Sequence, residues 1–121
     1  PRALRRMVRN HLFRHVELFA FEREEALEEL DSYLDTPPDW PAAMDEYFDE
    51  YADLGLDASA RSGDMVLIRQ GTGDEAGYWF VRQILDDPEG DHGWSLQGTV
   101  DLAATDEAGE VRLSELRIVA G

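Results

Sequence analysis

The sequence predicts an α+β domain in which N-terminal helices pack on one face of a curved, four-stranded antiparallel sheet. Apolar residues recur at helical spacing in the first part of the chain, whereas after Asp64 they alternate with the period of two that is typical of strands. The later connections are short and rich in glycine and acidic residues, as antiparallel hairpins require. We therefore expect a single domain over residues 1–121, with a helical part at about 2–54 and the sheet at about 64–121.

The helical part begins with a segment that runs from Leu4 to about residue 33. Glutamates, which are good helix formers, fill the places between its apolar residues after Phe21. This pattern fits either one long helix or two helices that meet near Phe21–Glu24. The sequence Thr36-Pro37-Pro38-Asp39 then stops the segment, because proline lacks an amide donor and restricts the residue before it. The apolar positions are Leu4, Val8, Leu12, Val16, Phe19, Leu27, Leu30 and Leu34.

A further helix is expected to begin near Asp39-Trp40-Pro41, where proline is tolerated in the first turn. Its apolar stripe consists of Met44, Tyr47, Phe48 and Tyr51. Six aromatic residues fall at core-facing spacings, so we interpret them first as core and second as pocket lining. They are Trp40, Tyr47, Phe48, Trp79, Phe80 and Trp94. Gly55–Gly63 is expected to be a loop.

Four strands are expected at Met65–Gln70, Tyr78–Leu85, Trp94–Leu102 and Val111–Val119. The second has apolar residues on both faces, so we expect it to be central and covered by helices. The third alternates cleanly, which predicts one face exposed to solvent. In the fourth the alternation slips near Ser114-Glu115, where we expect a β-bulge. Three hairpin connections, at Gly71–Gly77, Asp86–Gly93 and Ala103–Glu110, would join these strands.

Helices followed by a strand meander favour an NTF2-like, cone-shaped version of this fold, and an SH3-like barrel with a helical extension is the alternative. An NTF2-like cone often holds a pocket between its helices and its sheet. The side chains that could project into such a pocket are Tyr47, Tyr51, Trp79, Arg82 and Asp101.

Charge is the strongest signal in the composition. Acidic residues number 27 against 11 basic ones, all of them arginine, and the net charge of -16 repels phosphate backbones over most of the surface. Five arginines nevertheless fall in the first fourteen residues, where there is no acid. They could dock on an acidic protein surface, whereas the acidic body disfavours direct contact with nucleic acid. This candidate interaction face consists of Arg2, Arg5, Arg6, Arg9 and Arg14.

The motifs of common catalytic sites are missing from the sequence. A phosphate-binding P-loop needs a lysine, which the chain lacks, and no serine lies in a GxSxG context. His11 and His15 are four residues apart and could share a helix face, but the glutamate of the HExxH motif is missing and neighbouring arginines oppose a cation. We interpret both histidines as helix-surface or interface residues, and we assign no catalytic, cofactor-binding or metal-ligating residue.

The turn between the second and third strands has the densest group of candidate metal-ligating or acid/base residues. Four carboxylates and an imidazole within seven residues could bind a hard cation or supply an acid/base pair, although their spacing is not that of an EF-hand. We favour a rigid turn in which aspartates cap backbone amides and Trp94 anchors the returning strand. The candidate residues of this turn are Asp86, Asp87, Asp91, His92 and Trp94.

The absence of cysteine excludes disulfides and thiolate metal sites and fits a reducing cytoplasm, where we expect the protein to reside. No run of about 18 apolar residues is present, so we expect no interaction with a membrane.

Two segments carry a resemblance to a known family. Arg82–Trp94, followed by Val100–Gly109, resembles the end of the DUF3516 region, which follows the motor domains in a group of DEAD/DEAH-box helicases found mostly in actinobacteria. Arg5–Glu17 and the acidic helix after Trp40 are similar too. The resemblance implies that the chain is the C-terminal part of a larger helicase that hydrolyses ATP and remodels RNA or DNA.

The same resemblance implies that ATP and Mg²⁺ belong to the motor domains of the parent protein alone, because none of the motor motifs has a matching position here. It implies a non-catalytic accessory or interaction domain. Its partners would be the helicase motor core in the same chain or another protein. Nucleic acid would be bound by the parent helicase. The alternative is an NTF2-like module that binds or converts a small molecule in the pocket described above.

Overall fold

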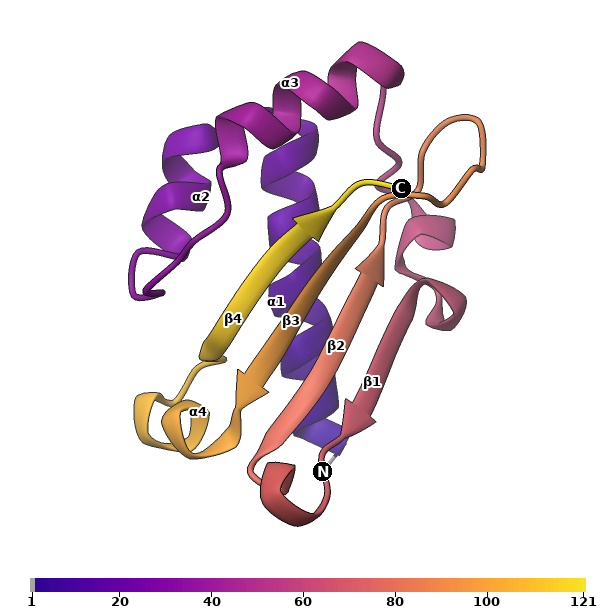
Figure 1. Cartoon of the computed structure of the whole chain (residues 1–121). Coiled ribbons are helices and arrows are strands. Elements are labelled where there is room, and N and C mark those ends of the chain that lie inside the picture. The colour runs from indigo at the N-terminus through magenta and orange to yellow at the C-terminus, as the bar shows by residue number, and fades with distance from the viewer. Residues whose placement is uncertain (1) are drawn as a thin grey trace.

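The computed structural model describes residues 2–121 and arranges them in two layers (Figure 1). α1 crosses one face of the sheet, α2 and α3 follow at one end of it, and no helix of the described residues lies on the opposite face. The elements are α1 (Arg2–Ala20), α2 (Glu24–Leu30), α3 (Trp40–Glu50), β1 (Val66–Gln70), β2 (Tyr78–Ile84), β3 (Ser95–Asp101), α4 (Leu102–Ala108) and β4 (Leu113–Val119). Short 3₁₀ turns occupy Ala58–Arg61, Gly63–Met65 and Gly73–Glu75. The predicted α+β class is confirmed.

The first helical segment consists of two helices and not of one long helix, so the second of the two alternatives that its sequence pattern allowed is correct. α1 ends in a Schellman motif, in which the amide of Arg23 donates to the carbonyl of Leu18 at 2.8 Å and the amide of Glu22 donates to that of Phe19 at 3.0 Å. This motif requires a left-handed residue, and Glu22 takes that conformation with a φ of 54°. The chain then turns back into α2.

α3 begins where the sequence predicts. The Asp39 carboxylate accepts the amide of Ala42 at 3.1 Å, which caps the helix, and Pro41 lies in the first turn.

The sheet is a meander of order β1-β2-β3-β4, and all neighbouring strands are antiparallel. β1 and β4 form its two edges and are not paired with each other, so the sheet stays open and the barrel alternative is wrong. The predicted bulge in the fourth strand is confirmed. Thr99 pairs with Glu115 and Val100 with Leu113, which leaves Ser114 as the extra residue.

The connection between β3 and β4 differs from the expected plain loop because it contains α4. The Asp101 carboxylate caps this helix by accepting the amide of Ala104 at 3.0 Å. Gly109 ends it in the left-handed conformation, with a φ of 74° and its amide bonded to the carbonyl of Thr105. Both capping residues stand in the sequence, but seven residues give too little periodicity to indicate a helix.

β2 is central, as expected, but helices cover only one of its faces. Trp79 and Val81 are buried in the core, whereas Tyr78 and Phe80 lie on the open face. The expectation of two covered faces is therefore wrong. The guanidinium of Arg69 lies 4.5 Å from the centre of the Phe80 ring and shields part of its apolar surface, which is how this strand tolerates an aromatic residue on an uncovered face.

Apolar side chains from α1, α3 and the sheet fill the space between the two layers. At its centre Tyr47, fully buried, packs edge to face against Phe19 at 5.6 Å and against Trp94 at 5.4 Å. Trp40 and Trp79 are buried in the same core, and Phe48 packs against it. The interpretation as core is therefore confirmed for five of the six aromatic residues and is wrong for Phe80, which lies on the open face.

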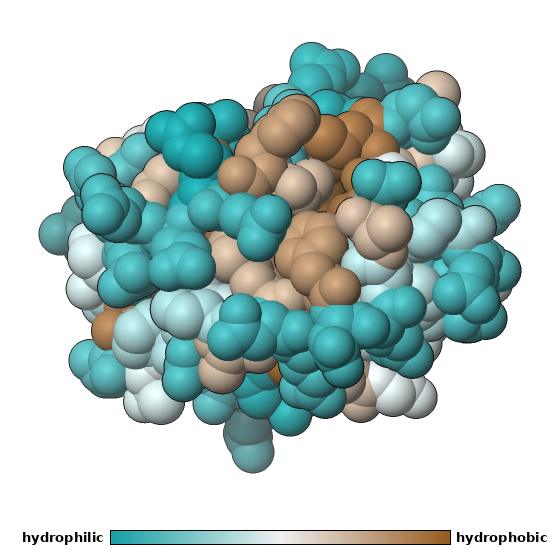
Figure 2. All heavy atoms as spheres, turned by 90° about the horizontal axis from the view of Figure 1, so that it is seen from above, coloured by the Kyte–Doolittle hydropathy of each residue, from teal (hydrophilic) through white to brown (hydrophobic). Residues whose placement is uncertain are grey.

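Seen from the side of α3, the surface is mostly hydrophilic and carries a cluster of apolar side chains (Figure 2). Phe21 follows α1 directly at this end and is 69% exposed, while Phe48 of α3 is half-buried and stacks on Phe19. Within residues 2–121 we find no helix that combines the length and the apolar content needed to cross a membrane.

Candidate functional site

Four of the five N-terminal arginines share one face of α1. Arg2, Arg5, Arg6 and Arg9 are spaced three or four residues apart, which places them side by side on a helix, and together they line a surface hollow of about 540 Å³. We call these four residues the arginine face. The guanidinium of Arg5 lies 5.3 Å from the centre of the Trp79 ring, which ties this face to β2. Within residues 2–121 none of the four forms an ion pair with a carboxylate.

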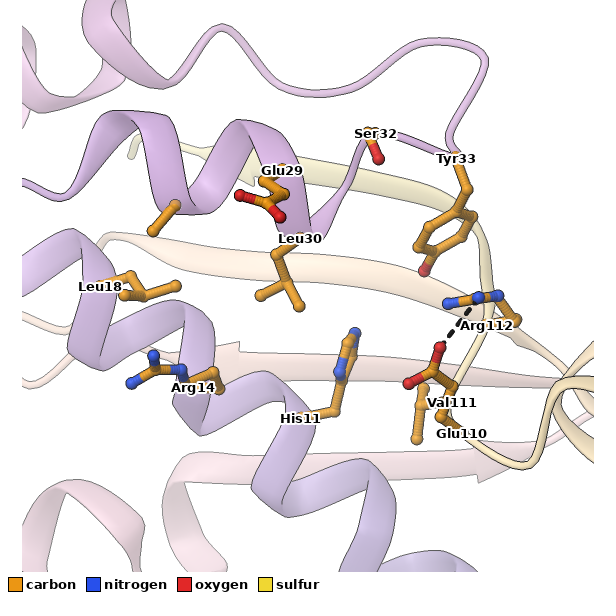
Figure 3. A pocket seen from close by; sticks show the side chains of 11 residues that line it. His11, Arg14, Leu18, Glu29, Leu30, Ser32, Tyr33, Glu110, Val111 and Arg112 are labelled. Atoms are coloured by element: carbon orange, nitrogen blue, oxygen red, sulfur yellow. Dashed lines mark ion pairs between the residues drawn. The ribbon is translucent and has the colours of Figure 1, made fainter.

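The structure places Arg14 apart from the arginine face. It follows Arg9 by five residues, which is about 140° around the helix at about 100° per residue. Arg14 instead borders a crevice of about 450 Å³ between α1, α2 and the start of β4 (Figure 3). The candidate face is therefore smaller than the sequence suggested.

That crevice has a half-buried histidine in its wall and an ion pair at its rim. Arg112 bonds to Glu110 at 2.9 Å and lies over the Tyr33 ring at 4.5 Å, and the Tyr33 hydroxyl accepts the amide of Leu113 (Figure 3). Burial raises the pKa of Tyr33. His11 Nε2 is buried and has no hydrogen-bond partner among the described residues. Burial, and then the neighbouring His15, lower the pKa of His11 from 6.5 to about 4, so its imidazole is neutral at pH 7.

His15 lies in the core, so our interpretation of it as a surface or interface residue is wrong. Its Nδ1 is 2.9 Å from the carbonyl oxygen of His11, which can only accept, so Nδ1 carries a proton. Its Nε2 is 2.7 Å from Asp31 Oδ1, and both side chains are fully buried. Because both ring nitrogens of His15 are engaged, His11 and His15 do not form a shared metal site although their rings lie 4.9 Å apart.

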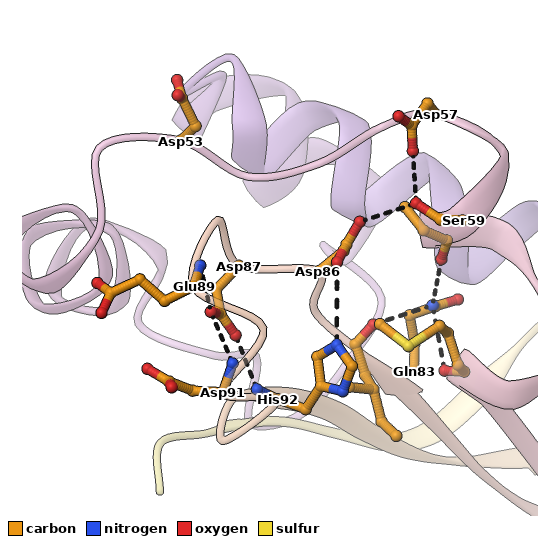
Figure 4. Close-up of polar contacts among 12 residues, drawn as sticks. Asp53, Asp57, Ser59, Gln83, Asp86, Asp87, Glu89, Asp91 and His92 are labelled. Atoms are coloured by element: carbon orange, nitrogen blue, oxygen red, sulfur yellow. Dashed lines mark hydrogen bonds and ion pairs between the residues drawn. The ribbon is translucent and has the colours of Figure 1, made fainter.

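The turn between β2 and β3 is built around the carboxylate of Asp87 (Figure 4). Its two oxygens accept the amides of Glu89, Asp91 and His92 at 2.8 to 3.0 Å, and the side chain is 3% exposed. Burial alone would raise the pKa of Asp87, but these amide donors hold it below its ordinary value. Asp86 is engaged more loosely, by the Ser59 hydroxyl at 3.3 Å and by His92 Nε2 at 3.9 Å.

Two further contacts fasten this turn to the C-terminal end of α3. The Tyr51 hydroxyl donates to Asp91 Oδ2 at 2.5 Å, and this hydrogen bond, followed by burial, raises the pKa of Tyr51. Trp94 Nε1 donates to Glu50 at 2.9 Å. Over residues 2–121 no three His, Asp or Glu side chains come together as a metal-binding group.

The residues predicted to line a pocket between helices and sheet are not brought together. Tyr47 and Trp79 are core residues, and burial raises the pKa of Tyr47 above its ordinary value. Arg82 is exposed on the open face of the sheet, and Asp101 caps α4. The space in which they were expected to meet is occupied by the aromatic core.

A second cavity, which the sequence did not predict, adjoins the arginine face. It has a volume of about 200 Å³, and Arg6 and Arg9 border it together with Arg61, Phe13 and Gln83. Gln83 is the only polar residue among the inward-facing positions of β2 and is 1% exposed. The sequence signal for this cavity was a single glutamine among the alternating apolar residues of the strand. That Arg61 lies near Arg6, from which it is more than fifty residues away along the chain, is seen only in the folded structure.

The comparisons with known proteins yield one match. No curated protein and no solved structure matches the chain, so the NTF2-like version of the fold stays a prediction. The sequence model of a family described as a domain of unknown function, DUF3516, matches residues 1–118 and thus nearly the whole chain. The protein therefore belongs to the DUF3516 family.

Proposed function

We propose that this domain is a non-catalytic accessory domain of an ATP-dependent DEAD/DEAH-box helicase, and that it docks through its arginine face on the helicase motor core or on another protein. Two lines of support motivate the proposal. The segments Arg82–Trp94 and Val100–Gly109 resemble the region that follows the motor domains in such helicases, and the chain lacks the lysine that a phosphate-binding loop needs.

The arrangement of the arginine face carries the proposal. Four guanidinium groups lie side by side and have no carboxylate partner among residues 2–121, although the chain has 27 acidic residues with which they could pair. Guanidinium groups are weakly hydrated, bind carboxylates through two parallel hydrogen bonds and are enriched in protein interfaces. An acidic surface on a partner would supply the missing counter-charges.

Electrostatics favour a protein partner over a long nucleic acid. At physiological ionic strength charges interact over about 8 Å, so a compact acidic patch docked on α1 would meet mainly the arginines. An extended phosphate chain would also meet the acidic body, which gives the whole domain a net charge of -16.

The first test uses charge reversal in the isolated domain. Arg2→Glu combined with Arg5→Glu should weaken binding to the purified motor domains of the helicase about tenfold or more, because each lost charge pair removes favourable contacts. Neither residue borders the smaller cavity. The matched control combines Arg23→Glu with Arg117→Glu, two exposed arginines elsewhere, and changes the net charge equally. Titration calorimetry would compare the two, and thermal melting would show that both variants fold.

The second test uses the whole helicase. ATPase and unwinding rates would be measured with and without this domain, and with the Arg2→Glu, Arg5→Glu pair in place. We expect the paired reversal to reproduce a large part of the effect of deletion. Unchanged activity, stability and partner binding after deletion, or equal weakening by the control pair, would contradict the proposal.

A further inference from the structure

The face of the sheet turned away from the helices is apolar and basic where β1 and β2 form it (Figure 1). Trp79, Val81 and Gln83 are buried toward the helices, so the alternate positions of β2 and their partners on β1 lie on the open side. These positions hold Leu67, Arg69, Tyr78, Phe80, Arg82 and Ile84. None of them is acidic, although the chain has 27 acidic residues. We call these residues the open patch.

The open patch is more apolar than a sheet face in water usually is. Sheets with one wet face generally place polar residues there, in alternation with the apolar residues of the core. Here Leu67 is 52% exposed and Tyr78 is 37% exposed, and the large apolar side chains exposed elsewhere in residues 2–121 are only Met7 and Phe21. A surface hollow of about 460 Å³ adjoins Leu67 and Phe80. An exposed apolar surface surrounded by polar residues is typical of a protein-binding site.

The two arginines of the open patch have no acidic partner. In the part of the chain that the structure describes, neither Arg69 nor Arg82 forms an ion pair. Arg69 lies over the Phe80 ring at 4.5 Å, and Arg82 Nε donates to the Ser95 hydroxyl at 3.4 Å. Both contacts position the guanidinium groups but do not neutralise them. The open patch is therefore a locally basic surface on an acidic molecule, and it is complementary in charge to an acidic partner.

The spacing of the two arginines fits a helix. Arg82 is paired with Leu67, and Arg69 follows Leu67 by two residues, so the Cα atoms of the two arginines are about 7–8 Å apart on a diagonal. Carboxylates at positions i and i+4 of a helix are about 6 Å apart along its axis, which lets one helix reach both guanidinium groups. Its apolar stripe would lie between them, against Leu67 and Phe80.

Two other occupants fit the patch less well. A single-stranded nucleic acid brings negative charges, but its extended backbone also meets the acidic body of the domain. A second copy of the chain would bring a further net charge of -16 to the contact.

We propose that the open patch binds an acidic amphipathic helix of a partner protein, whose apolar stripe covers Leu67 and Phe80 and whose carboxylates pair with Arg69 and Arg82. This site goes beyond the docking role proposed above and does not rest on it, because the arginine face belongs to α1, on the other side of the sheet (Figure 1).

Titration calorimetry of the whole 121-residue chain tests the site with a synthetic helical peptide of about 18 residues, roughly 27 Å long. Its leucines form one stripe, glutamates flank the stripe, and alanines fill the remaining positions. In one control peptide glutamine replaces leucine, and in a second control lysine replaces glutamate. The leucine–glutamate peptide should bind at least about tenfold more tightly than either control, because it alone offers both apolar area and negative charge.

Substitutions in the open patch provide the variants. Leu67→Gln and Arg82→Gln should each weaken binding of the leucine–glutamate peptide about fivefold or more, and both side chains are exposed, so neither change disrupts the core. The matched controls are Phe21→Gln and Arg23→Gln, an exposed apolar residue and an exposed arginine of the helical layer, which should leave the affinity unchanged. Amide NMR shifts on addition of the peptide should concentrate in β1 and β2.

Several results would overturn the proposal. They are no saturable binding of the leucine–glutamate peptide, equally tight binding of a control peptide, tighter binding of a single-stranded oligoribonucleotide, and binding that is lost with the Arg2→Glu, Arg5→Glu pair but kept by Arg82→Gln. Self-association of the chain that Leu67→Gln abolishes, measured by sedimentation, would overturn it too, because a second copy would then be the occupant. Failure of the docking role is seen separately, on the motor domains with Arg2 and Arg5.

Discussion

Glu22 adopts an unfavourable backbone conformation that the fold around it requires. The left-handed conformation at the end of α1 lets the chain turn into α2, and glycine adopts it without the steric penalty that a side chain brings. Glu22 is exposed, so its side chain offers no burial in return. The position is therefore a site of local strain that a substitution can relieve.

We predict that Glu22→Gly stabilises the domain by about 1 kcal/mol, because the left-handed conformation costs other residues roughly that amount. Urea unfolding followed by circular dichroism would measure the change. The matched control is Glu28→Gly in the exposed side of α2, which should destabilise by about 0.5–1 kcal/mol since glycine is unfavourable within a helix. Destabilisation by both variants would contradict the role assigned to Glu22.

His11 should make stability depend on pH between its two pKa values. Its pKa is lowered from 6.5 to about 4 in the folded protein, so between pH 6.5 and 4 the unfolded chain binds a proton that the folded chain refuses. Stability should therefore fall as the pH falls through this window. The slope contributed by His11 is about 1 kcal/mol per pH unit or less, since the ring is not fully removed from solvent.

The comparison with His11→Gln isolates this contribution from the other titrating groups. Thermal melting temperatures of the two proteins, measured at half-unit steps from pH 4 to 7, should diverge so that the parent loses more stability toward low pH. Parallel curves across this range would show that His11 protonates equally in both states.

Among the elements, the turn between β2 and β3 depends on one side chain for its geometry. Asp87 satisfies three backbone amides at once, and the turn in turn contacts α3 through the Tyr51–Asp91 hydrogen bond. Glu89, in the same turn, is exposed, and its side chain accepts none of these three amides.

We predict that Asp87→Ala destabilises the domain by about 2–4 kcal/mol, because it removes the acceptor of three partly buried hydrogen bonds at once. Asp87→Asn retains one oxygen and should cost less. Glu89→Ala removes a carboxylate two residues away and should change the free energy of unfolding by less than about 0.5 kcal/mol. Chemical denaturation of the three variants would rank them, and equal effects of Asp87→Ala and Glu89→Ala would refute the assignment.

The elements also show what the amino-acid pattern can and cannot predict. The helix and strand segments were predictable because apolar residues repeat every three to four positions in a helix and every two in a strand, and these repeats are long enough to recognise in the sequence. Even the bulge residue Ser114 was indicated, because it interrupts the alternation. α4 was not predicted because it has only seven residues, although Asp101 and Gly109 cap it. The separation of Arg14 from the arginine face was not predicted, although the angle of about 140° between Arg9 and Arg14 around a helix indicates it.

Contacts between residues far apart in the chain could not be predicted from such patterns. His15 is adjacent to arginines and reads as a surface residue, and only the approach of Asp31 explains its burial. The sequence near Gln83 does not indicate which of its amide atoms lacks a partner, since the carbonyls of Ala60 and Met65, about twenty residues away, help to orient the amide. The second cavity therefore emerges only from the tertiary structure.

At the scale of the whole molecule, the net charge of -16 should make stability depend on salt. Like charges repel one another in the compact state, and salt screens this repulsion. We predict that the melting temperature rises by several degrees between about 10 and 150 mM NaCl at pH 7. The rise should shrink near pH 5, closer to the sequence pI of about 4.3, and a melting temperature that falls with salt at pH 7 would mean that favourable ion pairs outweigh the repulsion.

The order of the elements has a consequence for biosynthesis. α1 is translated before the strands that cover its apolar side, whose core residues run from Trp79 to Leu116. Until then Val8, Leu12 and Phe19 have no sheet to pack against, whereas each strand finds its partner in the one just before it. The nascent helix is consequently the segment whose apolar side is most accessible to chaperones. A ribosome stalled before β4 would hold an incompletely folded domain with exposed apolar surface, which is prone to aggregate.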